Sequence, residues 1–296
     1  MGSSSSTWKH KGPTAMLTLP SDTGRLEPYR LSGDPLVPRV PKTALTRTAF
    51  AAAHVVSDPL RERSPWDTRP AVDWEATLGF RQGLWDQGLG LAEAMKAARD
   101  HTLAPRVACG AGTDHKPQAD LTCAQTIRDA YQDQAEAIEA AGGQLILMAS
   151  RAFPAIGATQ DVYHSVYRTL IDGAAEPVIL HWLGEMFDPA LQGYWGHADV
   201  DAASDFVLNL IAENPGKVDG IKISLLDQAH EERFRARLPD GVRLYTGDDF
   251  NYADLIAGDG QRFSHALLGI FAAIAPAAAQ ALEALAQDDH DRFRAL

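Results

Sequence analysis

The chain is poor in the features that mark secreted, membrane-spanning and disulfide-linked proteins. Its 296 residues include two cysteines, Cys109 and Cys123, too few for a disulfide framework, which favours the reducing cytoplasm. No stretch approaches the ~18 uninterrupted apolar residues of a membrane-spanning helix. Residues 1–15 contain a serine run where a secretory signal would be apolar, so we interpret them as tag-like and Met16 as the native start.

Positive charge is also scarce. Lys and Arg number 27 against 39 Asp and Glu, which gives a net charge of −12. Little basic surface is available to neutralise phosphates, so neither nucleic acid nor an anionic membrane is an expected partner. With 45% hydrophobic residues, the chain can build a sizeable core.

Common cofactor motifs are missing as well. Gly110 and Gly112 do not continue into the Gly-x-Gly-x-x-Gly spacing of a dinucleotide site. No histidine pair has the His-x-x-x-His spacing of helical metal ligands. We therefore predict no bound cofactor.

Proline is concentrated near the start of the chain. Six prolines fall between residues 12 and 42, and the apolar residues there follow no period. This composition predicts an extended arm in place of packed helices. We assign residues 1–45 to the tag-like start and arm, and residues 46–296 to a catalytic domain.

The domain alternates short apolar runs with helical patterns. The runs are apolar on both faces, as in parallel strands covered on both sides. They cover residues 46–56, 106–110, 144–149, 177–182, 218–224, 242–246 and 266–270. Helical spacing is found at residues 74–85, 120–141, 160–171, 199–211, 228–238 and 275–285. About eight such units indicate a (β/α)₈ TIM barrel, with a doubly wound open sheet as the alternative.

One apolar run carries a lysine. Lys222 lies within Val218–Ser224, and a lysine in a buried strand is costly to desolvate. It either pairs with a carboxylate, for which Asp227 and Asp248 are candidates, or becomes a nucleophilic amine. At the carboxyl end of a barrel strand, such an amine is suited to form a Schiff base.

The strand ends resemble those of the dihydrodipicolinate synthase and N-acetylneuraminate lyase superfamily of class I aldolase-type barrels. Gly220-Ile221-Lys222 resembles its strand-six Gly-Ile-Lys, and residues 245–249 resemble its strand-seven Ser-Gly-Asp-Asp. Residues 264–276 resemble the strand-eight segment, and residues 108–112 the glycine-rich end of strand three. The chain is most similar to an uncharacterised bacterial branch. The resemblance implies a TIM barrel, an imine on Lys222 and a homodimer or homotetramer.

The chain departs from the family at two motifs. Gly88–Glu93 lacks the hydroxyl pair that binds the substrate carboxylate, and His181-Trp182-Leu183-Gly184 replaces the tyrosine motif after strand five. Because imidazole titrates near neutrality, His181 could carry the protons in place of the tyrosine; a satisfied core histidine is the alternative.

Other residues at strand ends are candidates for substrate binding. Backbone groups at Gly110, Gly112 and Thr113 would orient the substrate. Ser150 and Arg151 could form a new carboxylate clamp, since arginine binds such groups bidentately, although a surface ion pair would also explain Arg151. Two more candidates follow the seventh strand: Thr246 and Asp248.

Together these features predict a class I lyase or aldolase acting on a small oxo-acid or keto-sugar. Two alternatives keep the barrel. In the first, His181 joins a metal site for isomerisation or cleavage, with further ligands from Glu185, His197, Asp199 and His230. In the second, the barrel binds a sugar or acid without catalysis.

Overall fold

The computed structural model describes residues 16–30, 35–58, 60–61, 71–92 and 106–296. The chain divides into two units, residues 1–37 and 38–296. The tag-like residues 1–15 and Glu93 lie outside the described residues. Among the described helices, none combines the length and apolar character needed to cross a membrane.

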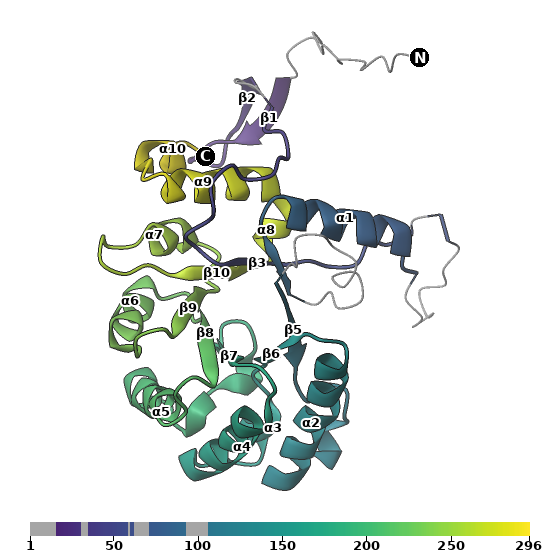
Figure 1. Ribbon diagram of the computed structural model, residues 1–296, viewed down its shortest axis with the longest axis vertical. Coiled ribbons are helices and arrows are strands. Elements are labelled where there is room, and N and C mark those ends of the chain that lie inside the picture. The colour runs from purple at the N-terminus through teal and green to yellow at the C-terminus, as the bar shows by residue number, and fades with distance from the viewer. Residues whose placement is uncertain (1–15, 31–34, 59, 62–70, 93–105) are drawn as a thin grey trace. The chain divides into compact units, whose positions relative to one another are not determined.

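Eight parallel strands of the second unit form a closed barrel, in the order β10-β3-β4-β5-β6-β7-β8-β9 (Figure 1). The strands are β3 (Ala49–Ala52), β4 (Gly90–Ala92), β5 (Val107–Ala111), β6 (Gln144–Leu147), β7 (Val178–Leu183), β8 (Val218–Ser224), β9 (Arg243–Thr246) and β10 (His265–Leu268). Because β10 pairs with β3, the sheet has no open edge, which confirms the predicted TIM barrel over the open sheet.

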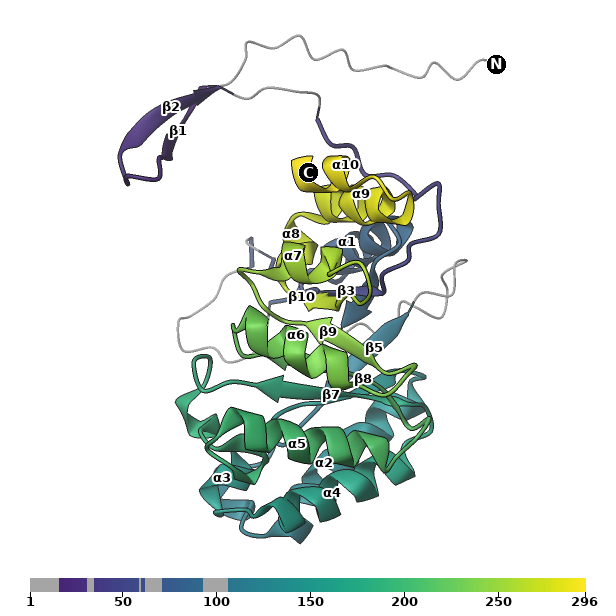
Figure 2. The same ribbon diagram turned by 90° about the vertical axis from the view of Figure 1, so that its left-hand side faces the viewer.

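Helices follow the strands and cover the outside of the barrel (Figure 2). They are α1 (Trp74–Asp86), α2 (Ala124–Ala140), α3 (Ala152–Ala155), α4 (Gln160–Gly173), α5 (Val200–Ala212), α6 (Gln228–Arg237), α7 (Tyr252–Ala257), α8 (Ile270–Ala273), α9 (Ala275–Ala286) and α10 (His290–Ala295). Short 3₁₀ turns are η2 (Gln118–Asp120), η3 (Pro189–Leu191) and η4 (Tyr194–Gly196).

Caps decide where two helices begin. Asp199 is the N-cap of α5, as the sequence predicts, and its side chain accepts from Ala202 N. Helix α2 begins at Ala124, four residues later than predicted, because Cys123 and Thr126 form a capping box there.

The N-terminal arm contains a hairpin that the sequence pattern did not predict. Strand β1 (Met16–Pro20) pairs antiparallel with β2 (Leu26–Arg30). All ten residues are exposed, so no buried face imposes the apolar alternation by which strands are recognised. The barrel unit begins at Pro38, earlier than the predicted residue 46, since Arg39 and the Lys42 amide bind Glu283 on α9.

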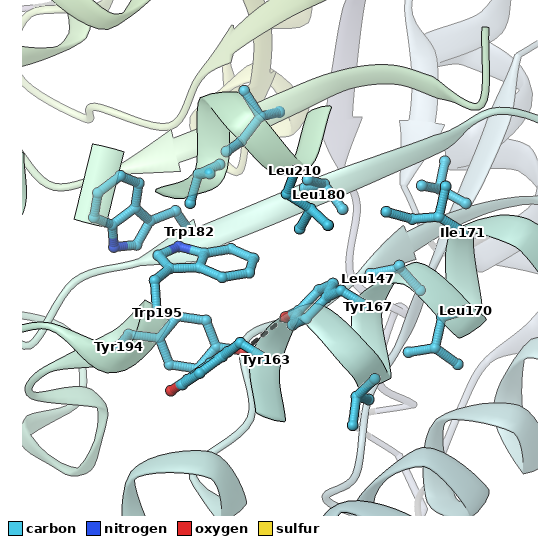
Figure 3. Packing of buried hydrophobic residues seen from close by; sticks show 14 of the residues in the cluster. Leu147, Tyr163, Tyr167, Leu170, Ile171, Leu180, Trp182, Tyr194, Trp195 and Leu210 are labelled. Carbon is cyan, nitrogen blue, oxygen red and sulfur yellow. Dashed lines mark hydrogen bonds between the residues drawn. The ribbon is translucent and has the colours of Figure 1, made fainter. Parts of the chain in front are cut away.

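The strands alternate between two cores. Inside the barrel, seven side chains form a small layer: Phe50, Ala92, Ala108, Ile146, Ile179, Tyr245 and Leu267. The residues that lie between these on each strand face the helices. On β7, for example, Leu180 and Trp182 face outward and pack with Tyr167 and Trp195 (Figure 3). A residue's place in this alternation therefore decides whether it reaches the barrel interior or the outer core.

Candidate active site

Lys222 and His181 are register partners on neighbouring strands. Lys222 is on β8, the sixth strand of the barrel, and His181 is on β7, the fifth. Both belong to the inward-facing set, because Ile179, two residues before His181, lies in the inner core, while the intervening Leu180 lies in the outer core. Adjacent strands lie about 4.8 Å apart, so the two side chains leave the sheet side by side. The structure thus brings the predicted nucleophile and proton carrier together.

Gly247 makes room for the lysine side chain. A Cβ at this position would lie 2.6 Å from Lys222 Cε and 2.2 Å from Ser224 Oγ. Lys222 and Ser224, two residues apart on the inner face of β8, therefore both lean against the end of β9. Any larger residue at 247 would displace one of them.

His181 is an uncharged imidazole. Its side chain is buried, and both burial and the nearby charge of Lys222 hold the pKa of His181 well below its usual range. Its Nε2 lies 3.3 Å from Ser224 Oγ, and its Nδ1 has no partner among the described residues. A neutral imidazole beside an amine has the protonation state that a general base needs.

Tyr245 closes the barrel interior beneath the lysine. It is the β9 register partner of Lys222, and its ring packs edge-on against Phe50 at 5.8 Å between centroids. Its hydroxyl donates to Asp219 Oδ2 at 2.6 Å, near the amino end of β8. This tyrosine therefore has a structural partner, and its hydroxyl is directed away from the carboxyl ends of the strands.

Thr113 and Ser150 form a buried hydroxyl pair. They follow β5 and β6, and their Oγ atoms lie 2.6 Å apart. Ser150 Oγ also accepts from the Ala152 amide. Gly110 lies within β5, and the Gly112 amide donates to Gln134 Oε1 at 2.7 Å, so that amide is already used. All four residues lie toward the carboxyl ends of their strands, which is the end where barrel enzymes bind substrates.

Arg151 forms surface ion pairs. Its guanidinium lies 2.5 Å from Asp188 and 3.6 Å from Asp114, and about half of the side chain is exposed. The structure therefore gives Arg151 the surface ion pair considered as the alternative to a clamp.

The side chains of Thr246 and Asp248 form hydrogen bonds with residues other than Lys222 and His181. Thr246 is fully buried on the outer face of β9, where its hydroxyl donates to Glu231 Oε2 on α6. Asp248 Oδ1 accepts from the amides of Phe250 and Asn251, and its Oδ2 accepts from Asn251 Nδ2. Both residues shape the loop after β9, and the structure does not bring Thr246 to the face that carries Lys222.

The alternative metal site is not assembled. His197 Nδ1 accepts from the Asp199 amide, and His230 Nε2 lies 2.8 Å from Ser204 Oγ on the outer side of the barrel. Within the part of the chain that the structure describes, no group of three or more His, Cys, Asp or Glu side chains converges on one point.

Ser224 and Gly247 are the site residues that the sequence interpretation missed. Ser224 lies two residues after Lys222 on β8, so the two side chains are on the same, inner face of the strand. Taking every second residue from Lys222 would have identified it in the sequence. Gly247 lies in the family-like motif at residues 245–249, but its contacts depend on the pairing of β8 with β9.

Comparison with solved structures defines the fold class as that of the dihydrodipicolinate synthases. The Aquifex aeolicus dihydrodipicolinate synthase is 13% identical, with a TM-score of 0.59 over 84% of this chain and 78% of that one. The pyruvate complex of YagE from E. coli K12 is 13% identical, with a TM-score of 0.61 over 85% and 79%. The Thermotoga maritima enzyme is 10% identical, with a TM-score of 0.58 over 85% and 80%. The predicted resemblance is confirmed for the fold.

The chain itself belongs to the family described as "Protein of unknown function (DUF993)", whose model matches residues 17–104 and 96–296. No curated protein matches the sequence.

Proposed function

We propose that this protein is a class I lyase or aldolase that forms a Schiff base between Lys222 and a small oxo-acid or keto-sugar. The main support is the register pairing of Lys222 with the neutral, buried His181 on the inner face of the barrel. The site uses the protein's own side chains and no cofactor. The enzyme would act in the cytoplasm as a homodimer or homotetramer.

The reaction begins at the Lys222 amine. After this amine has given its proton to water, its nitrogen attacks the substrate carbonyl, and loss of water leaves a protonated imine. The imine accepts the electron pair released when a carbon–carbon bond to the neighbouring carbon breaks, giving an enamine. Protonation of the enamine and addition of water then release the product and restore the amine.

His181 would move the protons. In the carbon–carbon cleavage, its neutral Nε2 or Nδ1 accepts the proton from the hydroxyl on the carbon that departs as a carbonyl compound, and the same imidazolium protonates the enamine. The Ser224 hydroxyl, 3.3 Å from Nε2, can hold the ring or pass the proton on. Because burial disfavours imidazolium, the proton is returned readily once taken.

A buried hydroxyl pair at the carboxyl end of the barrel could bind the substrate. Thr113 and Ser150 supply the two hydroxyl groups that the stretch around Gly88 lacks. We propose that this pair, with the backbone at Gly110, orients the substrate carboxylate or hydroxyl. Arg151 would reach a substrate anion only by exchanging its contacts with Asp188 and Asp114.

Borohydride trapping tests the proposal. The protein is incubated with pyruvate, other 2-oxo acids and ketoses, reduced, and measured by intact mass and peptide mapping. The expected result is a single adduct on Lys222 that disappears in Lys222→Arg. Lys217→Arg is the matched control, because this lysine of the same segment binds the carbonyls of Asp172 and Ala174 and should leave the adduct unchanged. Saturable ligand binding without any adduct would favour the non-catalytic barrel instead.

A further inference from the structure

A cavity lies on the opposite face of β7 from the Lys222–His181 site. Its volume is about 380 Å³, and it opens between the segment joining β7 to α5 and the segment joining β8 to α6. Trp182 lines it, whereas the preceding residue, His181, points into the barrel. The two sites therefore share a strand and have separate linings.

The floor of this cavity is apolar. Trp182, Leu191, Tyr194 and Ala203 are all buried and line it. Figure 3 shows Trp182 and Tyr194 within the aromatic cluster of the outer core. This floor would hold a ring or alkyl chain rather than a hydrated ion.

Four carboxylates surround the mouth against one guanidinium. They belong to Glu185, Asp199, Asp201 and Asp227, and Arg233 lies 3.6 Å from Asp201. Asp199 and Asp227 each use Oδ1 to cap a helix, and no described residue forms a hydrogen bond with either Oδ2. The mouth consequently favours a cationic group over an anionic one.

His230 has a hydrogen-bond acceptor, Nδ1, to which no described residue donates. This histidine lines the cavity, is 2% exposed, and has no partner for Nδ1 among the described residues. The Ser204 hydroxyl donates to Val200 O at 2.7 Å, so Ser204 Oγ must accept from His230 Nε2 at 2.8 Å. The ring proton is thus on Nε2, and Nδ1 is a buried acceptor that a donor in the cavity reaches when the ring turns toward it. A buried acceptor of this kind costs free energy until a donor meets it.

We propose that this cavity is a second binding site, for a small amphipathic amine whose apolar body carries an O–H or N–H donor. The ammonium group lies among the carboxylates at the mouth, the apolar body rests on the Trp182 floor, and the donor binds His230 Nδ1. The proposal does not depend on imine chemistry at Lys222.

Three probes of similar size test each part of the site. Tyramine has the ammonium, the ring and the hydroxyl; phenethylamine lacks the hydroxyl; 3-(4-hydroxyphenyl)propionate reverses the charge. Dissociation constants are measured on the full chain by calorimetry and ligand-observed NMR. Tyramine is expected to bind about fivefold or more tightly than phenethylamine, and the propionate is not expected to bind.

Variants locate the binding. Glu185→Gln should weaken both amines about fivefold, whereas Glu232→Gln, the same charge change on a residue of α6 outside the cavity lining, should not. His230→Phe should reduce tyramine to the affinity of phenethylamine. Lys222→Ala should leave all three probes unchanged, which separates this site from the proposed active site.

The contrary outcomes are equally specific. Failure of both amines to bind, equal binding of the propionate, or equal effects of Glu185→Gln and Glu232→Gln would overturn the proposal. Glu185 is exposed, so its variant is expected to fold even if His230→Phe does not.

Discussion

The Thr246 hydroxyl donates to Glu231 Oε2 at 3.0 Å, joining the outer face of β9 to helix α6. Ser264 Oγ donates to the other oxygen, Oε1, at 2.8 Å. Burial raises the pKa of Glu231 to about 7, and the two hydroxyl donors only partly offset this effect. Gly247, which contacts Lys222, directly follows β9. The end of β9 is thus bonded, through Thr246, to the Glu231 carboxyl group, which titrates near neutral pH.

Glu231 should make the protein less stable as pH rises. Since the folded pKa lies above the usual value, the native state holds the proton more tightly than the unfolded chain. Its contribution is full below about pH 4.5 and is lost as pH rises through about 7, by about 3 kcal/mol. Urea unfolding from pH 4.5 to 8 should show this decline, and Glu231→Gln should lack it.

Buried histidines change the free energy of unfolding with pH in the opposite direction to Glu231, and they serve as an internal reference. Burial lowers the pKa of His265 to about 4, so its contribution is lost as pH falls from about 6.5 through 4, in both proteins. The difference between wild type and Glu231→Gln therefore isolates Glu231. Identical pH profiles for the two proteins would contradict the assignment.

Gly247→Ala should disturb the Lys222 site. The new Cβ would lie 2.2 Å from Ser224 Oγ and 2.6 Å from Lys222 Cε, so the side chains or β9 must shift, at a cost of about 1–3 kcal/mol. We expect a lower urea midpoint and a reduced yield of borohydride adduct.

Gly269→Ala is the matched control for that experiment. A Cβ at Gly269 would meet nothing within 4 Å, and this residue has φ −63° and ψ −41°. Neither stability nor adduct yield should fall there. A loss of adduct in both variants would point to a general effect of the substitution.

His181→Gln should separate imine formation from proton transfer. The amine of Lys222 remains, so the carbonyl compound that labels the wild type should still give a borohydride adduct. Exchange of deuterium into the carbon next to the carbonyl, followed by NMR, should slow by about 10²–10⁴-fold. Unchanged exchange would assign the proton transfer to another group.

The Thr113–Ser150 pair should show energetic coupling. Thr113→Val leaves the Ser150 hydroxyl, a buried group, without its 2.6 Å partner, and Ser150→Ala does the converse. In a double-mutant cycle by urea unfolding, we expect a coupling of about 1 kcal/mol. Strictly additive effects would show that the two hydroxyls do not interact in solution.

Much of the barrel was predictable because its signals are local. Val218–Ser224 was predicted with the bounds that the structure gives to β8, since an apolar run between helix and turn signals shows its own ends. Strand β4 was harder to recognise: Gly90–Ala92 is three residues long and follows a glycine-rich run. The β1–β2 hairpin left no apolar alternation because both of its faces are exposed.

The candidate site was only half predictable. Lys222 and His181 could be placed at strand ends from the sequence, and the structure makes them register partners. Thr246, Asp248 and Arg151 are equally polar and lie equally close to strand ends, yet each has its partners elsewhere. The sequence on either side of Lys222 and His181 does not distinguish them from Thr246, Asp248 and Arg151.

The sequence by itself determined the rhythm of strands and helices, the capping of α5 by Asp199 and the burial of a lysine-bearing strand. These follow from residues close together in the chain. Only the tertiary structure decided which side chains meet. Barrel closure fixes the register between β7, β8 and β9, and a shift of one residue would place Thr246 on the inner face, where Gly247 now meets Lys222.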